Sequence, residues 1–374
     1  MQYRKWYNKD ITTSTLGFGA MRLKVINDEI DEDKGLALID EAYKSGINYF
    51  DTAVPYTDGK NETFVGKALK RYPRDSFYLA TKLTIRLYKT KEELEKVIDS
   101  QLQNLQTDYI DFYLMHALNK HTFQTIKEWK IMEIVEEWKK AGKIRHIGFS
   151  FHDDYETFKE IVDYYDWDFC QIQLNYMDDE IQQGIKGYHD LVKRQIPVVI
   201  MEPVKGGKLA SFNEDVAQKF KEYAPQASLS SWAMRWVASL DGVKVILSGM
   251  NEMEQLEDNL KTFSDFKKLN VTEQKLIEQV KESLKKITEV GCTNCQYCMP
   301  CTVGVNIPGN FRIFNDYAMY RSEGDAKWHY HDFINKKANA SLCIECGKCV
   351  PQCPQGIDIP NELKRMLTIL PFLE

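Results

Sequence analysis

The sequence lacks any apolar run that approaches the ~20 residues of a membrane-spanning helix. It also lacks a basic excess, because 49 lysine and arginine residues face 55 aspartate and glutamate residues. No basic patch stands out, which argues against nucleic acid as a partner. The N-terminal residues MQYRKWYNKD contain no apolar secretory segment. We therefore expect a cytoplasmic protein with neither a membrane nor a nucleic acid as its partner.

Cysteine is scarce except in two short runs near the C-terminus, Gly291–Pro308 and Leu342–Pro360, which hold eight of the nine cysteines. The second run has the C-x2-C-x2-C-x3-C-P spacing of a two-cluster bacterial ferredoxin, in which the fourth cysteine ligates the other cluster. This spacing predicts two 4Fe–4S clusters and one-electron chemistry. The predicted ligands are Cys292, Cys295, Cys298 and Cys353 for one cluster, and Cys343, Cys346, Cys349 and Cys301 for the other.

The two runs form an internal repeat whose first cysteines are 51 residues apart (343 − 292). The first run departs from the pattern, since only two residues separate Cys298 from Cys301 and Thr302 stands where proline is expected. The assignment of Cys301 therefore stays open. Two zinc sites are one alternative, and disulfides, which need an oxidising compartment, are another. Cys170, alone in an apolar strand, is expected to be a small core residue.

Eight short apolar runs alternate with helical patterns in the first two thirds of the chain. The strand candidates are residues 15–21, 47–52, 76–83, 109–116, 144–150, 169–175, 197–204 and 243–250. Alternating strands and helices predict parallel pairing. Eight such units in about 235 residues favour an α/β fold of the (β/α)8 TIM-barrel type. An open doubly wound sheet is the alternative, disfavoured because no G-x-G-x-x-G follows the first strand.

The domain boundary is expected near residue 270, with a barrel over residues 1–270 and a small, mainly helical, dicluster ferredoxin-like domain over residues 271–374. Ahead of the barrel, the first 15 residues predict a hairpin that turns at Asn8–Asp10 and covers the closed end of the barrel. Apolar residues from Ile126 to Trp138 predict one amphipathic helix that stops at Gly142.

Four polar residues fall at or just beyond the C-terminal ends of three consecutive predicted strands. They are Asp51, Tyr56, Lys82 and His116. In a barrel, chemistry takes place at this end of the strands. An ammonium beside a phenol favours proton release from the phenol, a carboxylate keeps the ammonium charged, and an imidazole can orient a carbonyl group. The four residues together predict a proton-donating site.

At this point the chain resembles a known family. GFGAMRL, DTAVPYTDGKNETFVGKAL (Asp51–Leu69), ATK and LMH are similar to the aldo-keto reductases, over roughly residues 10–265. The resemblance implies a (β/α)8 barrel that reduces a small carbonyl substrate. It implies Tyr56 as general acid, Lys82 and Asp51 as the pair that tunes it, and His116 as the residue that orients the carbonyl. The cysteine-rich tail resembles the subgroup with a fused ferredoxin-like domain.

The resemblance also implies a nicotinamide cofactor, NADH or NADPH. Its expected contacts are Ser150, Gln171, Met201, Ser248, Gly249, Gln255 and Asn259. Met201 stands where the family commonly places an aromatic ring. The stretch after the eighth strand has Glu252 and neighbouring glutamates where the family typically has cations for a 2′-phosphate, so a preference for NADP over NAD should be weak. Lys205 and Lys208 are either pyrophosphate contacts or solvated loop charges.

The two halves of the chain differ in the number of electrons that they handle. Nicotinamide transfers two electrons at once and a cluster transfers one, so direct exchange needs a carrier such as a flavin. A flavin mononucleotide (FMN) on the same barrel is therefore an alternative cofactor. A ferredoxin or a flavoprotein is an expected redox partner. A barrel that serves only as an electron-carrier module is a third interpretation, and clusters that only stabilise the tail or sense redox state are a fourth. The sequence names no substrate.

Overall fold

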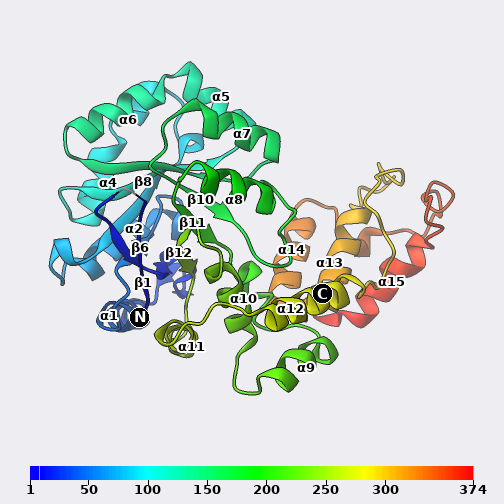
Figure 1. Ribbon diagram of the computed structural model, residues 1–374. Helices are drawn as coiled ribbons and strands as arrows, with labels where there is room; N and C mark the ends of the chain where they lie inside the picture. Colours follow the sequence, from blue (N-terminus) through cyan, green and yellow to red (C-terminus); the bar gives the residue numbers. More distant parts are fainter. Residues whose placement is uncertain (8, 374) are drawn as a thin grey trace. The chain divides into compact units, whose positions relative to one another are not determined.

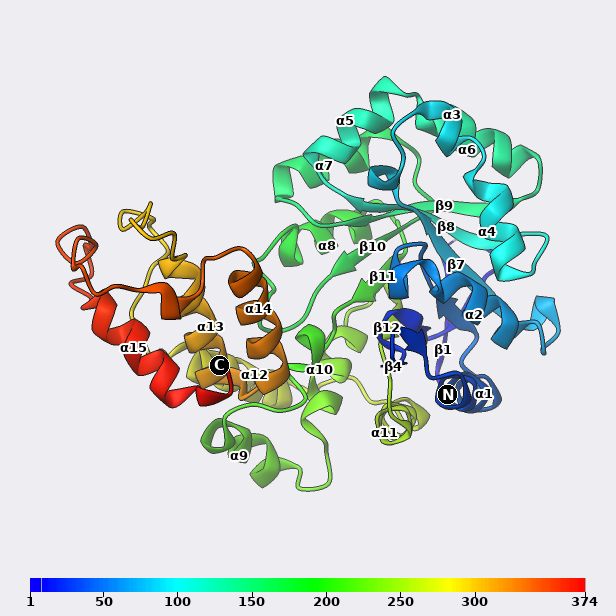
Figure 2. The same cartoon turned by 180° about the vertical axis from the view of Figure 1, so that it is seen from behind.

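A closed barrel of eight parallel strands dominates the first compact unit of the chain, Met1–Lys205 with Ser231–Asn270. The structure is a computed structural model and describes residues 1–7 and 9–373. Helices surround the barrel, as Figure 1 shows and Figure 2 shows from behind. The strands are β3 (Leu16–Gly19), β6 (Tyr49–Asp51), β7 (Tyr78–Leu83), β8 (Ile110–Leu118), β9 (Ile144–Phe151), β10 (Phe169–Gln173), β11 (Val198–Met201) and β12 (Val243–Ser248). The predicted (β/α)8 fold is confirmed.

Helices separate the barrel strands along the chain. They are α1 (Glu32–Lys44), α2 (Asn61–Leu69), α3 (Lys91–Leu94), α4 (Val97–Leu105), α5 (Lys120–Glu128), α6 (Ile131–Lys140), α7 (Tyr155–Tyr164), α8 (Gly184–Lys193), α10 (Leu229–Ala238) and α11 (Met253–Ser264). The single helix predicted from Ile126 to Trp138 is wrong. The chain breaks into α5 and α6 at Lys130, whose φ of 54° is left-handed and interrupts the helical hydrogen bonds. Among the described residues no helix is long and apolar enough to cross a membrane.

The N-terminal hairpin closes the barrel at the end where the strands begin. Strands β1 (Tyr3–Lys5) and β2 (Thr12–Ser14) pair antiparallel, which confirms the predicted hairpin. The predicted turn at Asn8–Asp10 starts at Asn8, outside the described residues. Trp6 is almost fully buried, and its ring lies 4.7 Å from that of Phe112 inside the barrel. The hairpin does not cover the opposite end of the barrel, where the strands finish and where an active site can form.

The second compact unit joins two separate stretches of chain, Gly206–Ser230 and Val271–Glu374. Its helices are α9 (Glu214–Tyr223), α12 (Val271–Lys285), α13 (Ile307–Tyr320), α14 (Glu323–Asn335) and α15 (Ile359–Ile369). Buried Phe311, Phe314 and Tyr330 contribute to its core.

The sequence analysis had assigned Gly206–Ser230 to the barrel. In the structure, Lys208 from this stretch forms ion pairs with Asp316 (3.0 Å) and Asp325 (2.8 Å), which bind the stretch to α13 and α14. Helix α9 packs against α12 as well. The second unit is therefore larger than the predicted C-terminal domain.

Candidate active site and cluster loops

The four residues of the predicted proton-donating site come together at the C-terminal ends of β6, β7 and β8. Asp51 ends β6, Lys82 lies in β7, and His116 lies in β8. Tyr56 begins the short turn Tyr56–Gly59 that follows β6. The Lys82 ammonium lies 5.0 Å from the centre of the Tyr56 ring, and the Tyr56 and His116 rings are 6.0 Å apart. Parallel strands in register place these side chains at one edge of the barrel.

Lys82 is fully buried and forms an ion pair with Asp51. Its Nζ donates to Asp51 Oδ1 over 2.6 Å and to the carbonyl oxygen of Thr52 over 2.8 Å. A buried charge is tolerated when it is paired and hydrogen-bonded. Two short contacts, from the last residue of the neighbouring strand β6 and from the residue after it, therefore fix the ammonium in place beside Tyr56.

The electrostatics keep Tyr56 protonated at neutral pH. Burial raises the pKa of Tyr56, and the nearby Lys82 ammonium opposes that rise. Burial lowers the pKa of Lys82, but Asp51 and Tyr56 outweigh it and raise that pKa above its usual value. Burial also raises the pKa of Asp51, against the opposing charge of Lys82. A protonated phenol beside a cation is an acid whose conjugate base is stabilised.

His116 is neutral over the physiological range. Burial, followed by the charges of Lys82 and Arg86, lowers the pKa of His116 to about 2. The Nδ1 atom of its ring lies 2.6 Å from Oγ1 of Thr84, a buried residue directly after β7. The sequence analysis missed Thr84. Its signal was its position two residues after Lys82, which places both side chains on one face of an extended chain.

Gln171 and Ser150 lie side by side on neighbouring strands of the barrel, as the register of β9 and β10 shows. Gln171 donates from Nε2 to the Met201 sulfur over 3.5 Å, while its Oε1 is buried and accepts no hydrogen bond from any described residue. Ser150 Oγ accepts the Ala117 amide over 2.7 Å. A buried amide oxygen without a donor is costly. The site therefore fits a group that brings an N–H donor, such as the carboxamide of nicotinamide.

The loop after β12 is held by its own side chains. Ser248 Oγ accepts a hydrogen bond from Asn259 (3.0 Å), and the Gln255 side chain accepts the Asn251 amide (2.9 Å). A Cβ on Gly249 would come within 2.7 Å of the Arg22 side chain, so a larger residue there would force Arg22 to move. Ser248, Gln255 and Asn259 thus stabilise the conformation of this loop. A ligand can use only those donors and acceptors of the loop that these hydrogen bonds leave unoccupied.

Two cationic side chains from the N-terminal part of the chain lie at this loop. Lys34 of α1 pairs with Glu252, and the Arg22 side chain lies against Gly249. The sequence analysis found no cation because it considered only the residues of the loop itself.

The other two candidate phosphate contacts have carboxylate partners. Lys205 pairs with Asp178 over 2.6 Å, and Lys208 forms the two ion pairs within the second unit. Neither is a solvated loop charge.

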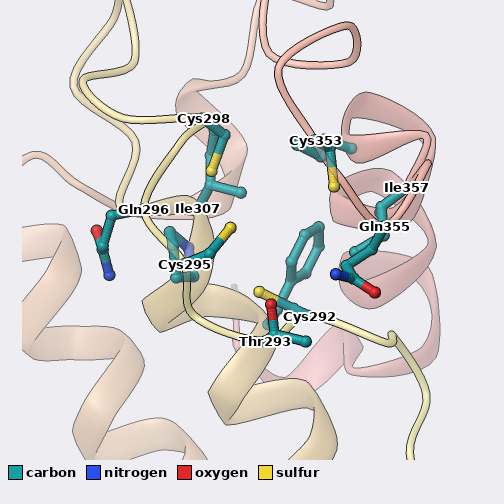
Figure 3. A pocket seen from close by; sticks show the side chains of 12 residues that line it. Cys292, Thr293, Cys295, Gln296, Cys298, Ile307, Cys353, Gln355 and Ile357 are labelled. Atoms are coloured by element: carbon teal, nitrogen blue, oxygen red, sulfur yellow. The ribbon is translucent and has the colours of Figure 1, made fainter.

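The first predicted cluster ligand set lines one small pocket in the second unit. Its cysteines are Cys292, Cys295, Cys298 and Cys353. Figure 3 shows the sulfur atoms of these four cysteines around the same space. The pKa of Cys298 is raised by burial and then by the thiolates of the other three. One run thus supplies three thiols, and the other supplies the fourth, as the crossed pattern predicts.

The second predicted ligand set is also grouped. Burial raises the pKa of Cys349, and the thiolates of Cys343, Cys301 and Cys346 raise it further. Thr302, which stands where proline was expected, lies with its hydroxyl 3.7 Å from the Cys346 sulfur. The contact brings the end of the first run, with Cys301, against the second run. Cys301 therefore lies near Cys349, and its assignment as a ligand of this set stays a prediction.

The internal repeat extends to the backbone. Asn294 and Glu345 have left-handed φ of 57° and 53°, and Gln296 and Gly347, two residues later, both have φ of 67°. Both runs then lead into a helix with proline in its first turn, α13 and α15. The two loops lie side by side in both views of Figures 1 and 2. The two loops therefore share a backbone conformation as well as a cysteine spacing.

The cysteine side chains are grouped but form no disulfides. Within the described part of the chain, no three His, Cys, Asp or Glu side chains are placed to hold a single metal ion. Four thiols nevertheless line one pocket. All nine cysteines are free of disulfides. This arrangement fits an iron–sulfur core better than a tetrahedral zinc ion, whose sulfur ligands lie about 2.3 Å from the metal.

The fold and the four-residue site define a barrel oxidoreductase, and comparison with known proteins gives its family. Residues 15–282 match the aldo/keto reductase family, and residues 291–357 match the 4Fe-4S dicluster domain. The chain belongs to the aldo/keto reductase family and carries a C-terminal 4Fe–4S dicluster domain.

Its relatives are oxidoreductases. An uncharacterized oxidoreductase of Bacillus subtilis is 28% identical over 70% of this chain and 90% of the relative. An NADH-specific methylglyoxal reductase of Escherichia coli is 27% identical over 67% of this chain and 90% of the relative. The solved holo form of an aldo-keto reductase from Bacillus halodurans is 28% identical, with a TM-score of 0.63, over 75% of this chain and 96% of that protein.

Proposed function

We propose that the barrel reduces a small aldehyde or ketone to an alcohol with NADH or NADPH. The observation that carries this proposal is the Tyr56 phenol, held protonated beside the buried Lys82–Asp51 ion pair and a neutral His116. Such a set of groups matches the chemistry of carbonyl reduction. The carbonyl oxygen needs a proton, and the phenolate left behind needs a nearby cation.

Each residue has a distinct part in the reaction. Bound reduced nicotinamide supplies the hydride that the carbonyl carbon accepts. Tyr56 gives its hydroxyl proton to the carbonyl oxygen, so the product is an alcohol. Lys82 stabilises the Tyr56 phenolate, and Asp51 keeps Lys82 charged. His116, being neutral, can donate a hydrogen bond from Nε2 to the carbonyl oxygen when the Thr84 hydroxyl donates to Nδ1.

The proposed nicotinamide contacts begin with Gln171, whose unpaired Oε1 can accept from the carboxamide, and with Ser150 and Met201 beside it. Ser248, Gly249, Gln255 and Asn259 shape the loop proposed for the adenosine phosphates. Lys34 is neutralised by Glu252, so it adds little attraction for a 2′-phosphate. The Escherichia coli relative is NADH-specific by name, which supports NADH as a cofactor.

For the second unit we propose two 4Fe–4S clusters on the two crossed sets of cysteines. Bound clusters exchange single electrons with a partner protein, a ferredoxin or a flavoprotein. The clusters can assemble only on reduced cysteine thiols. The reducing cytoplasm keeps thiols in that state, which is consistent with a cytoplasmic protein.

The test is to purify the full chain without oxygen and to measure three quantities. They are its bound flavin, its affinity for NADH and NADPH by calorimetry, and its turnover of a panel of aldehydes and ketones. We expect no flavin, binding of both nucleotides within about 100-fold of each other, and turnover of at least one carbonyl compound. Stoichiometric FMN would establish the alternative cofactor. Absence of both nucleotide binding and turnover would leave an electron-carrier module.

A further inference from the structure

A second pocket lies at the closed end of the barrel, where β12 begins, whereas the proton-donating site lies where the strands end. It is open and has a cavity volume of about 380 Å³. Its lining residues are Gln2, Arg4, Lys5, Asp241, Lys244, Phe266 and Lys268. Four of the seven carry positive charge and one carries negative charge, so the pocket has a net charge of +3 at neutral pH (4 − 1). The chain as a whole carries −6.

Lys244 is the unusual member of this pocket. Its side chain is 7% exposed, and its ammonium lies 4.0 Å from the centre of the Tyr7 ring. Within the described residues, Lys244 has neither an ion pair nor a side-chain hydrogen bond. Burial lowers the pKa of Lys244, and the nearby Arg4 lowers it further. A buried cation without an anion is costly, and the Tyr7 ring offsets only part of that cost.

The one carboxylate among the lining residues, Asp241, is shared between several cations. It forms an ion pair with Lys268, and it opposes the fall in the Lys244 pKa without forming an ion pair with Lys244. Arg4 donates to backbone carbonyl oxygens near the end of α10, including that of Val243 over 2.5 Å. Lys5 is exposed and, like Lys244, has no carboxylate partner among the described residues. Two ammonium groups on different strands, β1 and β12, therefore border one pocket without an ion pair of their own, and the single carboxylate of the lining is already paired with Lys268.

We propose that this pocket binds a multivalent oxyanion, namely a phosphate or pyrophosphate group, either free or carried by a small metabolite. An oxyanion can accept hydrogen bonds from Lys244 and Lys5 at the same time, and Lys268 is within the same lining. The pocket is concave, which suits a small ligand. The negative charge of the whole chain disfavours an extended polyanion such as nucleic acid. Phe266 offers an apolar wall to the remainder of a metabolite.

The experiment is calorimetric titration of the anaerobically purified full chain with inorganic pyrophosphate, inorganic phosphate and glycerol phosphate. We expect pyrophosphate to bind with one site per chain, with an affinity that falls as salt is raised. Lys244→Met should weaken that binding at least about tenfold, and Lys5→Gln should weaken it less because Lys5 is exposed. Lys267→Gln is the matched control, since Lys267 is an exposed neighbour outside the pocket lining. It should bind like the wild type.

The outcomes separate the possibilities. Tighter binding of glycerol phosphate than of inorganic phosphate indicates that the anion is carried by a metabolite, and the reverse indicates the free ion. Lys244→Met should also raise the melting temperature of the chain without ligand, because it removes an unpaired buried charge. Pyrophosphate should then stabilise the wild type but not the variant. Failure of all three anions to bind, or binding that Lys244→Met and Lys5→Gln leave unchanged, would overturn the proposal.

Discussion

The Thr84 hydroxyl lies 2.6 Å from Nδ1 of His116, so the residue that follows β7 sets the hydrogen bonding of a ring on β8. His116 is neutral, and a neutral imidazole carries its proton on one nitrogen only. When the Thr84 hydroxyl donates to Nδ1, the ring proton lies on Nε2. We propose Thr84 as a positioning residue, which would act on the substrate through His116.

Thr84→Val tests this role, because it keeps the shape of the side chain and removes the hydroxyl. We expect kcat to fall by roughly fivefold, the equivalent of about 1 kcal/mol for one lost hydrogen bond. Thr84→Ser, which keeps the hydroxyl, is the control and should restore most of the activity. Wild-type activity of Thr84→Val would show that the hydroxyl is not needed, and an equal loss in both variants would show that the fit of the side chain matters as much as its hydroxyl.

Tyr56→Phe removes the proposed proton donor and no other atom. We expect turnover of the best carbonyl substrate to fall by roughly 10²–10⁴-fold, with nucleotide affinity within about twofold of the wild type. Tyr164→Phe is the matched control, because Tyr164 is 41% exposed on α7 and far from the proton-donating site in the sequence. Wild-type turnover by Tyr56→Phe would make Tyr56 a structural residue.

The pH profile of turnover follows from the two shifted groups. Tyr56 must be protonated, and its pKa is raised, so activity is retained at neutral pH and is lost only as the pH rises through that raised value. His116 must be neutral, and its pKa is about 2, so its protonation matters only in strong acid. We therefore expect kcat/KM to be flat from about pH 6 to pH 9. A step near the ordinary histidine value of 6.5 would contradict the burial of His116.

The crossed ligand sets predict which cysteine variants resemble one another. Anaerobic protein should contain about eight iron and eight sulfide per chain. Cys353→Ser should damage the same centre as Cys295→Ser, although Cys353 and Cys346 lie in the same run. Electron paramagnetic resonance of the reduced protein can distinguish the two centres. Cys170→Ala, in the barrel, is the control and should keep the full iron content. Zinc without sulfide would refute the cluster assignment.

Lys208→Met tests the buried ion pairs of the second unit. The side chain of Lys208 is 11% exposed, and its removal leaves Asp316 and Asp325 without their cation. We expect a loss of roughly 2 kcal/mol of stability, below the value for a fully buried pair because both carboxylates are partly exposed. Thermal unfolding followed by cluster absorbance measures this unit. Lys336→Met, whose Asp332 pair is exposed, should change the stability little.

Local patterns in the sequence were enough to predict the eight strands and the proximity of Asp51, Tyr56, Lys82 and His116, whose role as a proton-donating site stays a prediction, and to group the cysteines in two sets. Each of these predictions depends either on residues that are close together in the sequence or on the rule that the C-terminal ends of parallel strands meet at one edge of the sheet. The helix predicted from Ile126 to Trp138 failed because apolar spacing carries no information about the left-handed turn at Lys130.

The sequence did not predict features that combine residues far apart in the chain. The basic pocket combines Arg4 and Lys5 with Lys244 and Lys268, so no single segment looks basic. Lys34 reaches Glu252 across 218 positions of sequence. Thr84 was overlooked for another reason, because a threonine beside a strand end is common and becomes informative only when its distance to His116 is known.

The assignment of Gly206–Ser230 to the second unit has a consequence for how this chain can be taken apart. A truncation at residue 270 keeps every barrel strand but deprives this stretch of the helix α12 and the carboxylates that hold it. The two units are therefore interleaved along the chain. A fragment that ends at residue 270 would carry an incomplete piece of the second unit, so the barrel cannot be separated from that unit by a single cut in the sequence.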